Sequence, residues 1–268
     1  FEPESVAILA QVCCSFASCT LASMSYLSFN TAVGGVDFEP EGTAEEQKEM
    51  LEKPMPLKFT WCIWEQIVAA DKGGQKKQHQ ADYAQTTREV AEFATVQDFW
   101  RLWNHIPQPS QLLDTSGGNF RRMVRDTESQ QSVIDAIMIF QKGVKPQWED
   151  TANAAGGHFQ VTIKIAAGGS GTPPGQIDEY WNNIVLGVIG ATVEPAEMIT
   201  GLRLVDKLSK SGGASMLRME IWFRDLADKD KVDILERSVK RCLGTKLDGV
   251  PNEAKLPKID IKPHSGGH

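Results

Sequence analysis

The sequence lacks the residue patterns of a metal-dependent or nucleophilic enzyme. Its five cysteines are odd in number and show no metal-ligand spacing, so reduced thiols are the simplest interpretation. The histidines His79, His105 and His158 are scattered, and no cysteine has a visible histidine or aspartate partner. The glycine-rich segment 168–173 has no Gly-Lys-Ser/Thr ending, which indicates a loop rather than a phosphate-binding turn. These absences predict a protein that is not an enzyme and that needs no metal and no cofactor.

The sequence also lacks an excess of basic residues and a clean apolar run. Its net charge of −7 makes it a poor general binder of the nucleic-acid backbone, so any RNA contact must come from a small basic pocket. Ser and Thr interrupt the apolar stretch 5–29, and the acidic Glu2 and Glu4 stand where a signal peptide would be basic. We therefore expect a cytoplasmic protein with no membrane contact.

The length of 268 residues and the hydrophobic content of 41% allow one substantial core with some chain left over. We expect an N-terminal extension over 1–52, partly disordered or helical, and one folded domain over 53–247. The last residues, 248–268, are rich in Pro, Lys and Gly and are predicted to form an irregular tail.

Hydrophobic periodicity within the domain indicates both strands and helices. Alternation predicts strands over 57–64, 159–165, 201–208 and 216–224. Helical spacing predicts helices from Thr95 to Ile106, from Ile177 to Ile189, and from about Val232 to Arg241, with Gly190 and Gly244 after the last two. Because no regular βαβ rhythm is present, the mixture predicts an α+β protein with an antiparallel sheet and helices on one face.

The two late strands place cationic and aromatic residues on one face of that sheet. In 216–224, alternation turns the apolar residues toward the helices and leaves Arg218 and Trp222 on the other face. In 201–208 the same argument leaves Lys207 there. An exposed surface with this composition suits a phosphorylated aromatic ligand, although each residue alone has a simpler explanation in solvation or packing.

Trp148 and Glu149 form the most informative local motif. They follow a turn at Pro146 and precede the glycine-containing loop 156–159. A tryptophan beside a carboxylate can receive a planar cationic ring, because its face supplies stacking and the carboxylate can accept two N–H groups. The pair therefore predicts recognition of such a ring.

The pair belongs to an ordered series of aromatic motifs. The series comprises Leu57-Lys58-Phe59-Thr60-Trp61-Cys62-Ile63-Trp64, Tyr83, Thr95-Val96-Gln97-Asp98-Phe99-Trp100, Asn104-His105-Ile106, Asp178-Glu179-Tyr180-Trp181, Gly190 and Ile221-Trp222. In this order it resembles the messenger-RNA cap-binding translation initiation factor 4E family, from about Pro54 to Leu247. The resemblance implies a curved antiparallel sheet, three helices on its convex face and a cap-binding slot on its concave face.

The resemblance implies a site for the 7-methylguanosine cap of mRNA. The methylated base would stack between Trp148 and Tyr83, where the family usually has a second Trp. Glu149 would accept hydrogen bonds from the guanine edge, and Trp222 would touch the N7-methyl group.

Three positions match the family's phosphate-binding residues. They are Lys207, Arg218 and His158. The family has Arg or Lys in place of His158, and a neutral histidine is a weaker phosphate partner.

The resemblance further implies a protein-docking surface on the convex face. There, a scaffold protein of the initiation factor 4G type or a 4E-binding repressor would dock a Tyr-x4-Leu helix. The matching positions are Pro56, Val96, Trp100 and Leu186, with Asn182 and Asn183 in place of the usual Leu and Glu. For Trp100, packing in the core is the competing interpretation, because aromatic residues flank it.

Two insertions relative to the family, at about 107–133 and 209–215, indicate a divergent paralogue, expected to be a monomer. Both are expected near the mouth of the slot. The first is basic with an aromatic residue, which suits RNA, although a mobile loop or a partner-specific patch is an equal alternative. A family member that acts mainly as a protein-interaction module or translational repressor, with weak cap binding, remains the alternative function.

Overall fold

The computed structural model describes residues 43, 45, 53–69, 86–112, 123–127, 130–165, 171–207, 216–246, 250–251 and 256–264. Eight strands form one antiparallel sheet in the order β2-β1-β4-β6-β7-β5-β8, and β3 pairs only with β4. The strands are β1 Pro56–Ala69, β2 Thr87–Thr95, β3 Met123–Thr127, β4 Gln130–Gln141, β5 Gly157–Lys164, β6 Ile199–Lys207, β7 Met216–Phe223 and β8 Ile259–Pro263.

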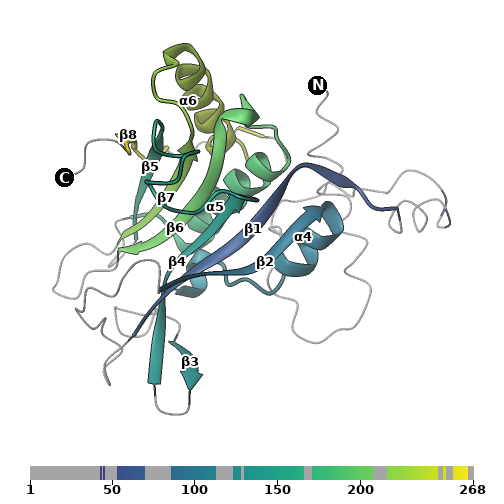
Figure 1. Ribbon diagram of the computed structural model, residues 1–268, viewed down its shortest axis with the longest axis vertical. Helices are drawn as coiled ribbons and strands as arrows, with labels where there is room; N and C mark the ends of the chain where they lie inside the picture. The colour runs from purple at the N-terminus through teal and green to yellow at the C-terminus, as the bar shows by residue number, and fades with distance from the viewer. Residues whose placement is uncertain are drawn as a thin grey trace.

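Three α-helices cover one face of this sheet, as Figure 1 shows. They are α4 Val96–Trp103, α5 Pro174–Ile189 and α6 Lys229–Leu243, and two short 3-10 helices lie at Pro109–Leu112 (η1) and Ala196–Met198 (η2). Apolar residues of all three helices join one core with alternate residues of the strands. The predicted α+β architecture is therefore confirmed. No helix in the described ranges is long and apolar enough to cross a membrane.

Local signals explain where the predicted helices begin and end. Thr95 caps α4, because its side chain accepts the backbone N–H of Asp98 at 3.1 Å. Gly190 and Gly244 follow the last residues of α5 and α6, as the sequence predicts. The four predicted strands are also present, as β1, β5, β6 and β7, with ends shifted by a few residues.

The prediction of an irregular C-terminal tail is wrong for its later part. Residues 259–263 form β8, which pairs with β5 at the edge of the sheet. Ile259 packs against the core, while Asp260 and Lys262 alternate with the two isoleucines. A charged edge strand has a weak apolar pattern, so composition alone misses it.

Strand residues that alternate with these core residues point to the other face of the sheet, which has no helices and which we call the open face. They form a second, smaller apolar cluster there. Its buried apolar members are Ala136, Met138, Phe140, Val144, Val205 and Trp222. Alternation therefore separates the core from the candidate site, as the late strands predict. The apolar residues of β7 point to the helices, and Arg218, Glu220 and Trp222 lie on the open face.

At Gly156 two backbone segments approach each other closely. A Cβ at this residue would lie 1.8 Å from the carbonyl oxygen of Phe223, at the end of β7. At Gly157 a Cβ would lie 2.6 Å from the carbonyl oxygen of Lys262, in β8. Only glycine allows the chain to enter β5 between these two backbones.

We predict that Gly156→Ala destabilises the fold by at least about 3 kcal/mol, because backbone must move to admit the methyl group. Gly175→Ala is the matched control, since a Cβ there meets nothing within 4 Å. Alanine favours the helix, so the control should be neutral or slightly more stable. Urea unfolding measures both, and equal stability of the two variants would contradict the interpretation.

Candidate functional site

Trp148 and Glu149 lie on the loop between β4 and β5, and both side chains are exposed. The loop is held by its own side chains. The Asp150 carboxylate accepts the backbone N–H of Lys145 at 3.0 Å, and the buried Asn153 amide donates to the carbonyl of Lys145 at 2.9 Å. Because these bonds close the loop from within, the tryptophan is presented from a fixed backbone.

An aromatic cluster lies between this loop and the open face. The ring of His264, the residue after β8, is nearly parallel to that of Trp148, at 12° and 6.3 Å between centroids. The same imidazole lies 4.3 Å from the ring centre of Trp222, and His158 stacks on Trp222 at 5.9 Å. Phe140 meets Trp222 edge-on at 5.2 Å. The two tryptophans are therefore joined through histidine.

Hydrogen bonds determine which nitrogens of the two histidines carry protons. Nδ1 of His264 lies 2.9 Å from the carbonyl oxygen of Asn153, which only accepts, so this nitrogen is the donor. In the neutral ring Nε2 then accepts, and it lies 3.2 Å from Nδ1 of His158. Burial lowers the pKa of His158 to about 4, although Glu220 opposes the shift. Burial also lowers the pKa of His264, so both rings are neutral at pH 7.

A buried carboxylate joins the cluster to two arginines. Glu220 accepts the indole N–H of Trp222 at 2.9 Å. Its other oxygen lies 2.7 Å from Nε of Arg218, and Arg203 approaches within 3.7 Å. Burial alone would raise the pKa of Glu220. The neighbouring groups Arg203, His158, Arg218 and the Trp222 N–H lower it by a larger amount, so the pKa lies below its usual value. The site thus contains an ionised carboxylate beside its cations.

The open face brings together several of the residues predicted for cap binding. Trp222 and His158 lie there but are buried, so the expectation of an exposed Trp222 is wrong: only 1% of its surface is accessible. The rings of His158, His264 and Phe140 pack against it. Arg218 lies on the same face and is partly exposed. Trp148 and Glu149 border this group from the loop.

Two of the predicted residues are not placed relative to the others. Lys207 ends β6 opposite Met216, and its side chain lies outside the described part of the structure. Tyr83 and the insertion 209–215 lie wholly outside the described residues. The first insertion, 107–133, is described in part, and Met123–Thr127 forms β3 against β4. Their functional roles remain predictions.

Sequence reasoning missed four residues of this site: Asn153, His264, Glu220 and Arg203. For Glu220 and Arg203 a signal was available, because alternation already places them on the open face. No comparable signal exists for His264, because it is 106 residues from His158 and its strand was not expected.

The residues predicted for partner docking lie on the helix-covered face. Pro56 is exposed at the start of β1, whereas Val96, Trp100 and Leu186 are buried members of the core. Trp100 is 4% exposed and contacts Phe99 edge-on at 4.9 Å. Trp100 is therefore packed in the core, as the competing interpretation expects.

Asn182 and Asn183 are buried and serve internal hydrogen bonds. Asn182 accepts the indole N–H of Trp103 at 3.1 Å and donates to the side-chain oxygen of Gln108 at 2.8 Å. Asn183 donates to the carbonyl of Thr245 at 2.6 Å. Leu at 182 would therefore remove the acceptor of the buried Trp103 indole N–H, rather than simply restore an apolar contact.

The chain's own segment after α4 also packs on α5. The backbone N–H and the hydroxyl of Ser110 donate to the carboxylate of Asp178, at 2.8 and 2.5 Å. Gln108 is buried beside Asn182. Part of the surface near the predicted docking residues is therefore covered by the chain itself.

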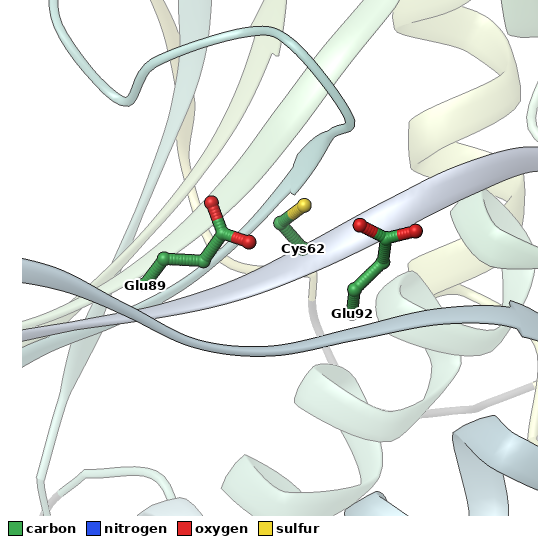
Figure 2. Close-up of side chains that lie close together, drawn as sticks. All are labelled: Cys62, Glu89 and Glu92. Atoms are coloured by element: carbon green, nitrogen blue, oxygen red, sulfur yellow. The ribbon is translucent and has the colours of Figure 1, made fainter.

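A second group of polar side chains lies where β1 pairs with β2. Figure 2 shows Cys62 of β1 between Glu89 and Glu92 of β2. Burial and a hydrogen bond to Glu89 raise the pKa of Cys62 to about 12, and Lys142 forms a 2.8 Å ion pair with Glu92. Because the Cys62 thiol is bonded to Glu89 and Glu92 is paired with Lys142, we interpret the group as a hydrogen bond beside an ion pair.

The family model for eukaryotic initiation factor 4E matches residues 56–256. The chain belongs to this family. The initiation factor 4E of Saccharomyces cerevisiae is 27% identical over 214 residues, 80% of this chain and 78% of that protein. The Xenopus laevis factor is 26% identical over 219 residues, 77% and 84% of the two chains.

Solved structures share the fold. Ascaris suum eIF4E-3, in complex with the m7G cap, has a TM-score of 0.56 at 24% identity, over 80% of this chain and 94% of that one. Caenorhabditis elegans eIF4E-3, in complex with the 4E-binding protein Mextli and a cap analog, has a TM-score of 0.54 at 21% identity, over 79% and 94%. This initiation factor 4E chain is therefore a non-enzymatic translation factor and a distant relative of these proteins.

We predict that the buried His158 makes the fold less stable in mild acid. Above pH 6.5 both folded and unfolded states hold a neutral ring; as pH falls from 6.5 toward 4, only the unfolded state takes up the proton. The stability lost over this window is about 3 kcal/mol. Urea unfolding of wild type and His158→Gln at pH 7 and pH 4.5 measures the difference. The exposed His105→Gln should behave as wild type, and an equal acid sensitivity in His158→Gln would contradict the prediction.

Proposed function

We propose that this initiation factor 4E chain binds the 7-methylguanosine cap of mRNA at Trp148 and Glu149. One observation supports this most strongly: a half-exposed tryptophan and an exposed carboxylate stand side by side on an internally bonded loop. The loop borders an open face that carries Trp222 and Arg218. A cytoplasmic role in translation initiation follows from this proposal.

The base would be recognised by charge as well as shape. N7-methylation makes guanine cationic, and a cation stacks on an electron-rich indole more strongly than a neutral ring does. Trp148 would supply one face and Tyr83 the other. Glu149 would accept the N1–H and the amino group, which a carboxylate can do with two oxygens.

The phosphates would meet Arg218 and Lys207. His158 is a weak candidate for this role, because its ring is neutral and its Nδ1 proton is directed to His264. The carboxylate of Glu220 also lies beside Arg218 and offsets part of its charge. We therefore assign most of the affinity to the base.

We predict that Trp148→Ala and Glu149→Ala each weaken binding of 7-methyl-GTP by about 1–3 kcal/mol, through lost stacking and through unpaired guanine donors. Both side chains are exposed, so the melting temperature should not change. Fluorescence titration measures the affinity. Unmethylated GTP should bind far more weakly to wild type, because its base carries no charge.

Two matched controls remove similar groups elsewhere on the surface. Glu197→Ala removes an exposed carboxylate, and Val90→Ala removes an exposed apolar side chain. Both should bind as wild type. Equal affinity for GTP and 7-methyl-GTP, or wild-type affinity in a folded Trp148→Ala, would sink the proposal and favour the alternative of a protein-interaction module.

The same chain would also dock a helix from a scaffold protein of the initiation factor 4G type or from a 4E-binding repressor. The relatives in complex with Mextli and with a 4E-binding protein support this proposal. The expected contacts are Pro56 and the surface edges of Val96, Trp100 and Leu186. Because Asn182 and Asn183 face inward, they would shape this surface rather than bind the partner directly.

We predict that Asn182→Leu lowers stability by about 1–3 kcal/mol, because the buried Trp103 indole N–H loses its acceptor. A Tyr-x4-Leu peptide should not bind more tightly as a result. Trp103→Phe removes the orphaned donor, so the cost of Asn182→Leu should shrink in that background. Thermal melts measure the stability, and peptide titration measures the affinity. Tighter peptide binding without any loss of stability would support a direct docking role for position 182.

A further inference from the structure

His264 touches both tryptophans of the candidate site, although none of the contacts proposed above uses it. Its ring is nearly parallel to Trp148 and lies against Trp222, and only 7% of its surface is exposed. It is delivered by β8, the strand that pairs with β5 directly beside the tryptophan loop.

The backbone N–H and both ring nitrogens of His264 are held within the fold. Its backbone N–H donates to the carbonyl of Gly156 at 3.1 Å. Its side chain donates from Nδ1 to Asn153 and accepts at Nε2 from His158. A buried residue with three such bonds, two of them from its ring, is a fixed part of the site that a ligand would not displace.

The fixed ring of His264 limits the motion of the Trp148 side chain. The indole is 45% exposed, and a parallel ring lies beside it. An exposed tryptophan on a loop can otherwise turn about its side-chain torsions, and a ligand would have to stop that motion on binding. A ring whose two nitrogens are both bonded on the protein side restricts the indole before any ligand arrives.

We propose that His264 is a positioning residue for cap binding, whose ring backs the indole of Trp148 and fixes it in the orientation that stacks on the methylated base. This inference rests on the proposed cap-binding function. It assigns the gain in cap affinity to the flat ring of His264. The hydrogen bonds of His264 only hold that ring in place. The two contributions can therefore be separated by substitution.

Three variants test the proposal in the full chain. His264→Phe keeps a flat ring but loses the hydrogen bonds, His264→Asn keeps a donor near Asn153 but loses the ring, and His264→Ala loses both. Affinity for 7-methyl-GTP should fall about five- to tenfold in the Asn and Ala variants and stay within about twofold in the Phe variant. Stability against urea should follow a different order, with the Asn variant above Ala.

A second readout needs no ligand. Fluorine-labelled tryptophan gives one NMR resonance for each indole, and Trp148→Phe identifies the resonance of Trp148. In His264→Ala and His264→Asn this resonance should shift and respond more strongly to solvent, whereas His264→Phe should restore a restricted ring. If wild type binds no cap at all, the cap-binding proposal fails, while the NMR result still decides whether His264 restricts Trp148.

Three results would overturn the inference. The first is an unchanged Trp148 resonance in His264→Ala. The second is cap affinity that follows the hydrogen bonds, with the Asn variant better than the Phe variant. The third is tighter cap binding after loss of the ring, which would make His264 an obstacle. If the Ala variant does not fold, the comparison of Phe with Asn gives the same decision.

Discussion

The close backbone approach at Gly156 and Gly157 is the constraint on which the candidate site depends. It lets the chain enter β5 between the ends of β7 and β8, where a side chain at either residue would meet backbone. Trp222 lies one residue before the end of β7, His264 follows β8, and the loop of Trp148 precedes β5. Three segments far apart in the sequence therefore meet at one corner of the sheet. The spacing of the rings follows from the spacing of the backbones that carry them.

Some elements of the fold could be predicted from the sequence and others could not. Alternation in β5, β6 and β7 and helical spacing in α4, α5 and α6 are strong signals, because burial on one face imposes them. β2 and β8 are edge strands with charged residues, and neither was predicted. Edge strands bury little of their surface, so their patterns need not be apolar. Local patterns thus predict β1, β5, β6 and β7, but they miss the edge strands and also the central strand β4, whose first residues fall within the insertion expected at 107–133.

The site was predictable to the extent that it depends on motifs. Trp148 and Glu149 stand together in sequence and remain together in space. His264 and Asn153 are missing from any such motif, because their roles come from contacts between segments more than a hundred residues apart. The direction of Asn182 was equally hidden, since the groups it bonds come from α4 and the segment after it. A family motif identifies which positions belong to a site. When another residue type stands at such a position, its burial and its contacts determine its role.

The charges of the open face indicate how such a site would divide its affinity. Two guanidinium groups, Arg203 and Arg218, face the single carboxylate of Glu220, and the neighbouring His158 is neutral at pH 7. One net positive charge therefore remains among these four residues. The carboxylate also holds the indole N–H of Trp222, so removing it would free a cation but release a ring of the aromatic cluster. Glu220 thus couples the phosphate side to the base side. A site built this way gains less from additional phosphates than one lined by free cations, and its selectivity must come from the base, where stacking on Trp148 and the charge of the methylated ring act together.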